Sequence, residues 1–322
     1  MSRIILFVLL LFLFACGDDE AKRDIYTEAP YAELTSRIRK EPTNAELYYL
    51  RARLFNKNGL TELAELDTRR AWHLDPKEDY AISMVNFLKE KSIDSTIVFI
   101  ETALPKLPGS YSLQVELARA HQENGNAEKA LEITNSVLNK HPKLVDALQL
   151  KAQLVKTQKA DLAIATLETA HALVPSDPRI ALELAFEYAE SNNPKALRLT
   201  DSLIRTGTAV DTAFYLKGLY YANTGNATAA IQNYDEAIRN NYRLLDPYRD
   251  KAQLLLRQKK YDEARNTVNL GLKVKPTEPE FFFLLAQVDE AEGNKAEAKL
   301  NYKKAYELDK TYTEAKEAYD RL

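Results

Sequence analysis

The sequence predicts an all-α protein built as a solenoid of about eight helix-turn-helix units. Small residues recur in three series about 34 residues apart, and prolines recur at the same spacing. The 322 residues include only nine glycines, and no runs of alternating apolar and polar residues stand out. A hairpin of two short helices cannot bury its own apolar stripe, so it needs copies of itself on either side.

Residues 211–240 contain the clearest copy of the unit. Apolar or small residues at steps of three and four place one stripe on each of two short helices. Between the helices lies Thr224-Gly225-Asn226, where Gly225 can adopt the left-handed conformation that commonly ends a helix.

The other units align on this one through their small residues. Helix axes approach to about 8–10 Å only where the side chains at the crossing are small. In the first helix the series is Ala52, Met84, Ala118, Ala152, Ala185, Gly218, Ala252 and Ala286. At the start of the second helix it is Ala64, Thr96, Ala130, Ala163, Ala196, Ala230, Ala264 and Ala298. Later in the second helix it is Ala71, Ala103, Val137, Ala170, Leu203, Ala237, Gly271 and Ala305. The boundary prolines are Pro42, Pro76, Pro108, Pro142, Pro175 and Pro276.

This order of small, aromatic and proline residues resembles the tetratricopeptide repeat (TPR) family. The resemblance covers roughly residues 44–310 and implies a right-handed superhelix over residues 30–322. We expect a helix over residues 31–40 to cap the first unit and residues 311–322 to cap the last. The units are expected at 44–76, 77–108, 109–142, 143–175, 176–208, 209–242, 243–276 and 277–310.

The N-terminus carries the features of an export signal. Arg3 precedes a 12-residue apolar run, which is too short to span a bilayer and fits a signal peptide over residues 1–15. The run ends in Leu13-Phe14-Ala15-Cys16, which resembles the lipobox of bacterial lipoproteins and implies a lipid anchor on Cys16. An ordinary signal peptide followed by an unrelated cysteine is the alternative.

Residues 16–29 are polar, lack periodicity and are expected to form a flexible acidic tether. By resemblance, Gly17 after the cysteine argues against retention in the inner membrane. The protein is therefore expected in the outer membrane, on its periplasmic or cell-surface face. The cluster Asp18-Asp19-Glu20 also resembles a surface-export signal, and a purely solvated tether is the alternative.

The composition argues against several other classes of protein. A net charge of −3 gives no reason to expect a nucleic-acid partner, and no GxxxxGK phosphate loop is present. The four histidines are scattered without ligand spacing, so no metal site and no cofactor are expected, and His121 is interpreted as packing. No nucleophile, base and orienting group come together, so we expect no catalytic residues and no enzyme.

In the TPR family ligands lie in the concave groove lined by the first helices. When the ligand-facing positions of the family's repeats are transferred to this sequence, the groove has an apolar patch on the fifth and sixth units and a basic edge on the seventh. Residues 239–275 hold ten Lys or Arg against four Asp or Glu. The alternative is that the apolar residues pack between neighbouring helices and the arginines form a solvated face. The candidate peptide-binding residues are Leu182, Phe186, Tyr215, Leu219, Arg249, Gln253, Arg257 and Phe283.

The leading functional hypothesis is a lipid-anchored scaffold that binds a peptide or protein segment in this groove. A cell-envelope assembly factor, pilotin-like or acting as an adaptor of the peptidoglycan machinery, is the first alternative. A glycan-capturing surface lipoprotein is the second, and it would need exposed tryptophans. Trp72 is the only tryptophan and is expected within a second helix, which counts against sugar binding.

Overall fold

The computed structural model describes residues 25–322, and in this range the chain is all-α, without a β-strand. The signal peptide and Cys16 lie outside the described residues. In the first part of the chain the helices are η1 (Ile25–Thr27), α1 (Ala32–Lys40), α2 (Ala45–Lys57), α3 (Thr61–Leu74), α4 (Glu78–Lys89), α5 (Ile93–Ala103), η2 (Leu104–Lys106) and α6 (Tyr111–Glu123). The next are α7 (Ala127–Lys140), α8 (Val145–Val155), α9 (Ala160–Leu173), α10 (Pro178–Glu190), α11 (Lys195–Arg205) and α12 (Val210–Asn223). The last are α13 (Ala227–Asn240), α14 (Asp246–Arg257), α15 (Tyr261–Val274), α16 (Pro279–Ala291), α17 (Lys295–Leu308) and α18 (Thr313–Arg321).

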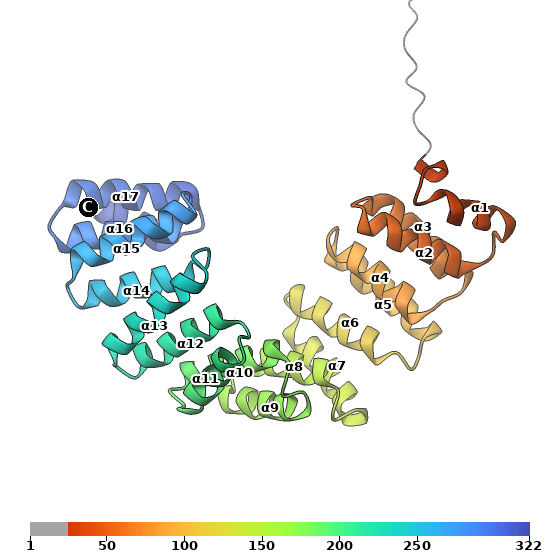
Figure 1. Ribbon diagram of the computed structural model, residues 1–322, viewed down its shortest axis with the longest axis horizontal. Coiled ribbons are helices and arrows are strands. Elements are labelled where there is room, and N and C mark those ends of the chain that lie inside the picture. Colours follow the sequence, from red (N-terminus) through yellow and green to blue (C-terminus); the bar gives the residue numbers. More distant parts are fainter. Residues whose placement is uncertain (1–24) are drawn as a thin grey trace, which may run out of the picture. The chain divides into compact units, whose positions relative to one another are not determined.

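These helices form an all-α repeat solenoid, as the sequence predicts. Each of the eight ranges expected to be a repeat contains two α-helices. The helices fall into two compact units, with the division between Asn124 and Gly125. Within each unit consecutive helices pack as hairpins, as for α2 with α3 and α12 with α13 (Figure 1).

The first unit begins earlier than the sequence predicts. Ile25 and Tyr26, assigned to the flexible tether, instead pack against a core cluster that includes Tyr31 and Phe55. The ring centroids of Tyr31 and Phe55 are 4.5 Å apart. Burial of the Ile25 side chain and of the Tyr26 ring favours folding of residues 25–29 onto α2. The polar composition of the segment does not predict these contacts.

A buried ion pair ties this N-terminal cap to the first repeat. Arg51 of α2 donates from Nε to Asp67 Oδ2 over 2.6 Å and from Nη2 to Oδ1 over 2.9 Å. Its Nη1 also donates to Thr35 of α1 over 2.9 Å, and its guanidinium lies 4.6 Å from the Tyr26 ring centroid. This bidentate ion pair neutralises two charges that are shielded from water. Together with the Thr35 hydrogen bond, it holds α1 against α2 and α3.

In the second unit the small residues lie where helices meet aromatic rings. A Cβ placed on Gly218 of α12 would lie 2.6 Å from Cδ1 of Tyr234 and 3.2 Å from the carbonyl oxygen of Ala230. A Cβ on Gly271 of α15 would lie 2.5 Å from Cζ of Phe281. Tyr234 and Phe281 are each 1% exposed, so the glycines make room for two of the largest core side chains.

Two departures from the repeat pattern are accommodated locally. In the range 77–108, α5 is followed by the 3-10 helix η2, which contains Pro105. In the range 277–310, Asp289 interrupts the aromatic pattern and is 3% exposed. It accepts hydrogen bonds from Arg265 Nη1 at 2.7 Å and Asn301 Nδ2 at 2.8 Å, so its buried charge is paired.

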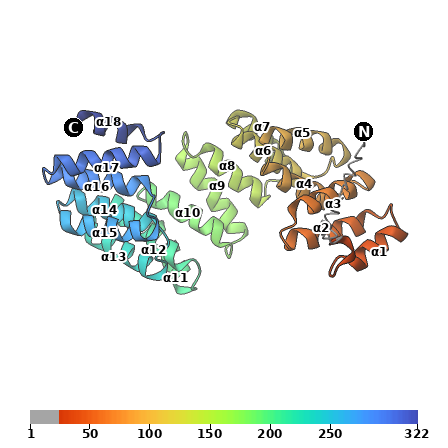
Figure 2. The same ribbon diagram turned by 90° about the horizontal axis from the view of Figure 1, so that it is seen from above.

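The C-terminal end of the second unit is covered by α18, which packs on α17 (Figure 2). Ala315 of α18 is fully buried in a cluster with residues of α14 to α17, while most of the outer residues of α18 are polar or charged. This helix therefore closes the apolar end of the stack. Over the part of the chain that the structure describes, none of the helices has both the length and the apolar composition needed to span a bilayer.

Candidate functional site

The candidate residues on α10 and α12 differ in how far they are exposed. Phe186 of α10 is 37% exposed, which is unusual for an aromatic side chain of this chain. Leu182, one turn earlier, is partly buried against Ala181, Leu203 and Ala213. Leu219 of α12 is also partly buried. Phe186 is thus the apolar candidate that presents the most free surface.

Tyr215 and Arg249 are held by one polar network between α12 and α14. The Tyr215 hydroxyl donates to Asp250 Oδ2 over 2.9 Å, and Arg249 Nε donates to Asp250 Oδ1 over 2.9 Å. Arg249 also pairs with Asp246 at 2.8 Å and with Glu280 of α16 at 3.3 Å. The network links the first helices of three consecutive repeats.

The electrostatics of this network are those of a satisfied structural cluster. Burial raises the pKa of Tyr215, and the neighbouring Asp250 carboxylate raises it further. Burial alone would lower the pKa of Arg249, but its attraction to Asp250, Asp246 and Glu280 outweighs that effect and raises it. With three acidic side chains around one guanidinium, Arg249 has little charge left for a ligand.

The basic edge is therefore smaller than the sequence count suggests. Most of the ten cations in residues 239–275 pair with acidic side chains, including several from outside that range, such as Asp235 for Lys251 and Asp289 for Arg265. Arg257 and Gln253 of α14 are exposed, and neither has an ion pair or side-chain hydrogen bond within residues 25–322. Of the two arginines proposed for the edge, Arg257 is the accessible one.

Phe283 belongs to the packing at the C-terminal end. Its ring centroid lies 5.3 Å from that of Tyr302 and 4.9 Å from that of Tyr312. It is partly buried among these rings, which makes it a weaker candidate for ligand contact than Phe186.

Corresponding side chains in the first helices of several repeats bond to the next repeat instead of facing a ligand. Gln149 Nε2 donates to Glu183 Oε2 over 2.7 Å, and Tyr49 and Ser83 share a 3.0 Å hydrogen bond between their hydroxyls. Tyr215 and Asp250 repeat the relation. Polar partners 34 or 35 residues apart are the sequence signal that could have separated these structural residues from ligand contacts.

The sequence raises two other kinds of site, one for a metal ion and one for a sugar. Among residues 25–322 no group of three or more His, Cys, Asp and Glu could hold a metal ion. Trp72 is 5% exposed, packs on Phe99 with ring centroids 5.6 Å apart and lies under the Lys106 ammonium. A tryptophan held in this way presents no open platform for a sugar ring.

Stacked helical hairpins with small residues at the crossings define a helical-repeat interaction scaffold. The chain contains tetratricopeptide repeats: profiles of that family match residues 87–154, 211–242 and 279–312. Repeats of this family act as protein–protein interaction scaffolds, and the chain is of that class. No curated protein matches the chain.

Solved structures that resemble the chain share its fold. A tetratricopeptide repeat protein from Parabacteroides merdae is 18% identical, with a TM-score of 0.62, and the match covers 75% of this chain and 97% of that one. The APC/C hetero-tetramer Cut9–Hcn1 is 14% identical, with a TM-score of 0.57, covering 91% and 59%. Human IFIT1, solved as a dimer with PPP-AAAA, is 22% identical, with a TM-score of 0.52, covering 86% and 67%.

Proposed function

We propose that the protein is a lipid-anchored scaffold that binds a peptide or protein segment along the first helices of its C-terminal repeats. The observation that carries the proposal is Phe186, a large apolar side chain left exposed on a first helix of an interaction repeat. Exposed aromatic side chains are the usual anchors of protein interfaces. Gln253 and Arg257, exposed on α14, supply a polar and cationic edge for the same segment.

The partner is proposed to be a protein. The net charge of −3 gives a polyanion no general attraction, so we propose that nucleic acid is not the ligand. No cofactor and no catalysis are proposed, since a scaffold of this family needs neither. If the captured partner is a component of the secretion, outer-membrane or peptidoglycan machinery, the scaffold acts as a cell-envelope assembly factor.

Binding can be tested with two substitutions. The partner is first captured from detergent-solubilised membranes on the mature protein and then measured in a purified assay. Phe186→Ala is expected to weaken binding at least about tenfold, since a central anchor contributes roughly 2 kcal/mol or more. Arg257→Gln is expected to slow association, and more so at low salt.

The matched controls carry the same kinds of side chain on second helices. Leu66, 59% exposed on α3, provides the apolar control as Leu66→Ala, and Lys273 on α15 provides the cationic control as Lys273→Gln. Both are expected to bind normally. Normal binding by folded Phe186→Ala and Arg257→Gln together would remove the first-helix surface as the binding site.

The anchor is proposed on Cys16, with the protein at the outer membrane on its periplasmic or cell-surface face. The support is the sequence Leu13 to Cys16 followed by Gly17. Cys16→Ser is expected to release the protein from membranes or to leave it unprocessed, as judged by fractionation and by the mass of the N-terminal peptide. A variant that is still processed and still membrane-bound would place the anchor elsewhere.

A further inference from the structure

The side of α10 that bears Phe186 also carries three carboxylates. Residues three or four apart along a helix are neighbours on its surface. Four such residues form one face of α10, which we call the acidic face: Glu183, Phe186, Glu187 and Glu190. Phe186 and Glu190 are exposed, and Glu183 and Glu187 are partly buried. The exposed aromatic ring therefore lies among negative charges.

No cation of the described chain neutralises the acidic face. Within residues 25–322, none of its three carboxylates has a Lys, Arg or His nitrogen within ion-pair distance. Glu183 accepts a hydrogen bond from the amide of Gln149 over 2.7 Å, and Glu190 accepts one from the amide of Asn223 over 3.2 Å. Because an amide is a neutral donor, both carboxylates keep their full charge.

Glu187 lacks even an amide partner. Its side chain makes neither an ion pair nor a hydrogen bond with any group of residues 25–322. Burial raises the pKa of the Glu187 carboxyl, and attraction to Lys156, just after α8, offsets part of this shift. The like charges of Glu183 and Glu190 raise the pKa further. A cation placed beside Glu187 by a ligand would stabilise its charged form.

The charge of the first-helix surface changes sign between α10 and α14. One repeat position carries Glu190 on α10, Asn223 on α12 and Arg257 on α14, and all three side chains are exposed. The helices pack in that order, α10 on α12 and α12 on α14. Arg257 has no ion pair within residues 25–322. The surface is therefore acidic at α10, neutral at α12 and basic at α14.

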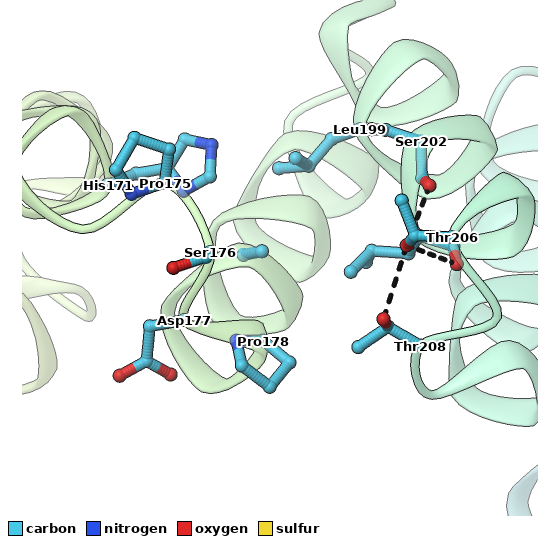
Figure 3. A pocket seen from close by; sticks show the side chains of 11 residues that line it. His171, Pro175, Ser176, Asp177, Pro178, Leu199, Ser202, Thr206 and Thr208 are labelled. Carbon is cyan, nitrogen blue, oxygen red and sulfur yellow. Dashed lines mark hydrogen bonds between the residues drawn. The ribbon is translucent and has the colours of Figure 1, made fainter.

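The opposite side of α10 presents no unmatched charge. At about 100° per residue, Ala181 points away from the acidic face, and it lines a pocket of about 390 Å³ (Figure 3). The carboxylate of Asp177 in this pocket pairs with Arg179 at 2.8 Å. The Thr206 hydroxyl donates to the carbonyl oxygen of Leu203 over 3.0 Å. The acidic face is thus the side of α10 that a charged ligand would stabilise.

We propose that the segment bound on the first-helix surface is bipolar. A lysine or arginine of the segment pairs with Glu187, a large apolar side chain beside it packs on Phe186, and a carboxylate further along meets Arg257. Packed helices lie about 8–10 Å apart, so α10 and α14 are roughly 16–20 Å apart. An extended chain advances about 3.3 Å per residue, which places the cation and the carboxylate about five or six residues apart. This inference rests on the proposed function, since the segment occupies the same surface.

The test is fluorescence anisotropy with labelled synthetic peptides and the full-length protein in detergent at low salt. The first peptide has a lysine, a phenylalanine next to it and a glutamate about six residues beyond the lysine, in a glycine–serine sequence. The second has glutamine in place of the lysine. The parent protein is expected to bind the lysine peptide about three- to tenfold more tightly. In Glu187→Gln this preference is expected to fall below about twofold, because the pairing carboxylate is gone.

Glu62→Gln is the matched control, since it removes the same charge from an exposed side chain of the second helix α3. It is expected to keep the full preference for lysine. Loss of the preference in Glu62→Gln would mean that only the net charge attracts the peptide. An unchanged preference in Glu187→Gln would mean that the lysine does not pair at α10. Either result, or failure of the lysine peptide to bind the parent protein, would overturn the proposal.

A third peptide tests the spacing, because its glutamate lies directly beside its lysine. Arg257→Gln is expected to weaken binding of the first peptide about threefold and to leave binding of the third unchanged. Equal effects on both peptides would overturn the bipolar arrangement.

Phe186→Ala separates this inference from the proposed function. If it weakens binding of the lysine and glutamine peptides alike, and the parent protein shows no preference between them, the first-helix surface binds a segment that is not bipolar. If Phe186→Ala alters binding of neither these peptides nor the captured partner, the proposed function fails together with this inference.

Discussion

At the scale of single residues, Gly218 matters because it has no side chain. The ring of Tyr234 occupies the space where a Cβ would lie, and the ring is 1% exposed and has no room to retreat. Gly218→Ala is expected to lower the free energy of unfolding by about 1–3 kcal/mol. This loss exceeds the gain of roughly 1 kcal/mol that alanine brings to a helix interior. Chemical denaturation followed by circular dichroism measures the difference.

Gly109→Ala is the matched control for Gly218→Ala. It adds the same methyl group, but a Cβ on Gly109 meets no atom within 4 Å. Its stability is expected to stay within about 0.5 kcal/mol of the parent protein. If Gly218→Ala also proves neutral, Tyr234 does not fix the distance between α12 and α13.

The side chains that define the candidate site show where prediction from the sequence stops. Phe186 and Arg257 are exposed as a ligand contact requires, and both follow from repeat position alone. Arg249 lies two turns before Arg257 on the same helix but is enclosed by Asp246, Asp250 and Glu280. The sequence shows the charges and their spacing along the chain, but not which side chain of the next repeat reaches back to pair with them.

At the scale of elements, the helices could be predicted nearly completely because their periodicity and their small residues are local signals. The N-terminal limit could not, since Ile25 and Tyr26 fold only through contacts with residues much later in the chain.

The turn between α14 and α15 has a lysine where most of its counterparts have a glycine. Lys259 adopts a left-handed conformation at φ +61°, and glycine fills the same position in most other repeats, as Gly59, Gly125, Gly225 and Gly293. Lys259→Gly is expected to stabilise the protein by about 0.5–1 kcal/mol, since the strain of a left-handed side chain outweighs the entropy that glycine loses. In thermal melts this corresponds to a rise in Tm of about 1–4 °C.

The reciprocal change serves as the control for Lys259→Gly. Gly225 has φ +82° with no atom within 4 Å of an added Cβ, so Gly225→Lys adds backbone strain without a clash. It is expected to lower Tm. If Lys259→Gly also lowers Tm, the lysine side chain makes a stabilising interaction that outweighs its backbone strain.

At the scale of the whole molecule, buried tyrosines make stability depend on alkaline pH. Burial raises the pKa of Tyr188, Tyr215, Tyr234 and Tyr302, and carboxylates near Tyr188, Tyr215 and Tyr302 add to the effect. Burial raises the pKa of Tyr312 to about 12. In the unfolded chain these phenols return to a pKa of about 10. The unfolded chain therefore binds fewer protons than the folded one above pH 10.

The sign of the effect follows from linkage between protonation and folding. A raised folded pKa gives a contribution that is complete below the unfolded pKa and is lost as pH rises toward the folded pKa. Tm should change little through these tyrosines up to about pH 9 and fall steeply above about pH 10. Each tyrosine contributes up to roughly 1.4 kcal/mol per pH unit to that fall. The part of the tyrosinate absorbance that comes from these five tyrosines, measured as the difference between the parent protein and Tyr→Phe variants, is expected to appear together with the loss of helical circular dichroism, and not before it.

Tyr234→Phe isolates the tyrosine contribution from the breaking of lysine ion pairs, which also weaken at high pH. The ring is retained against Gly218, while the titrating hydroxyl is removed. The variant is expected to release about one proton fewer on unfolding between pH 10 and pH 12, so its stability should fall less steeply there. An unchanged slope in Tyr234→Phe would exclude Tyr234 from the alkaline loss. If the tyrosinate absorbance that Tyr234→Phe removes rises while the protein is still helical, the phenol of Tyr234 is open to solvent in the folded chain.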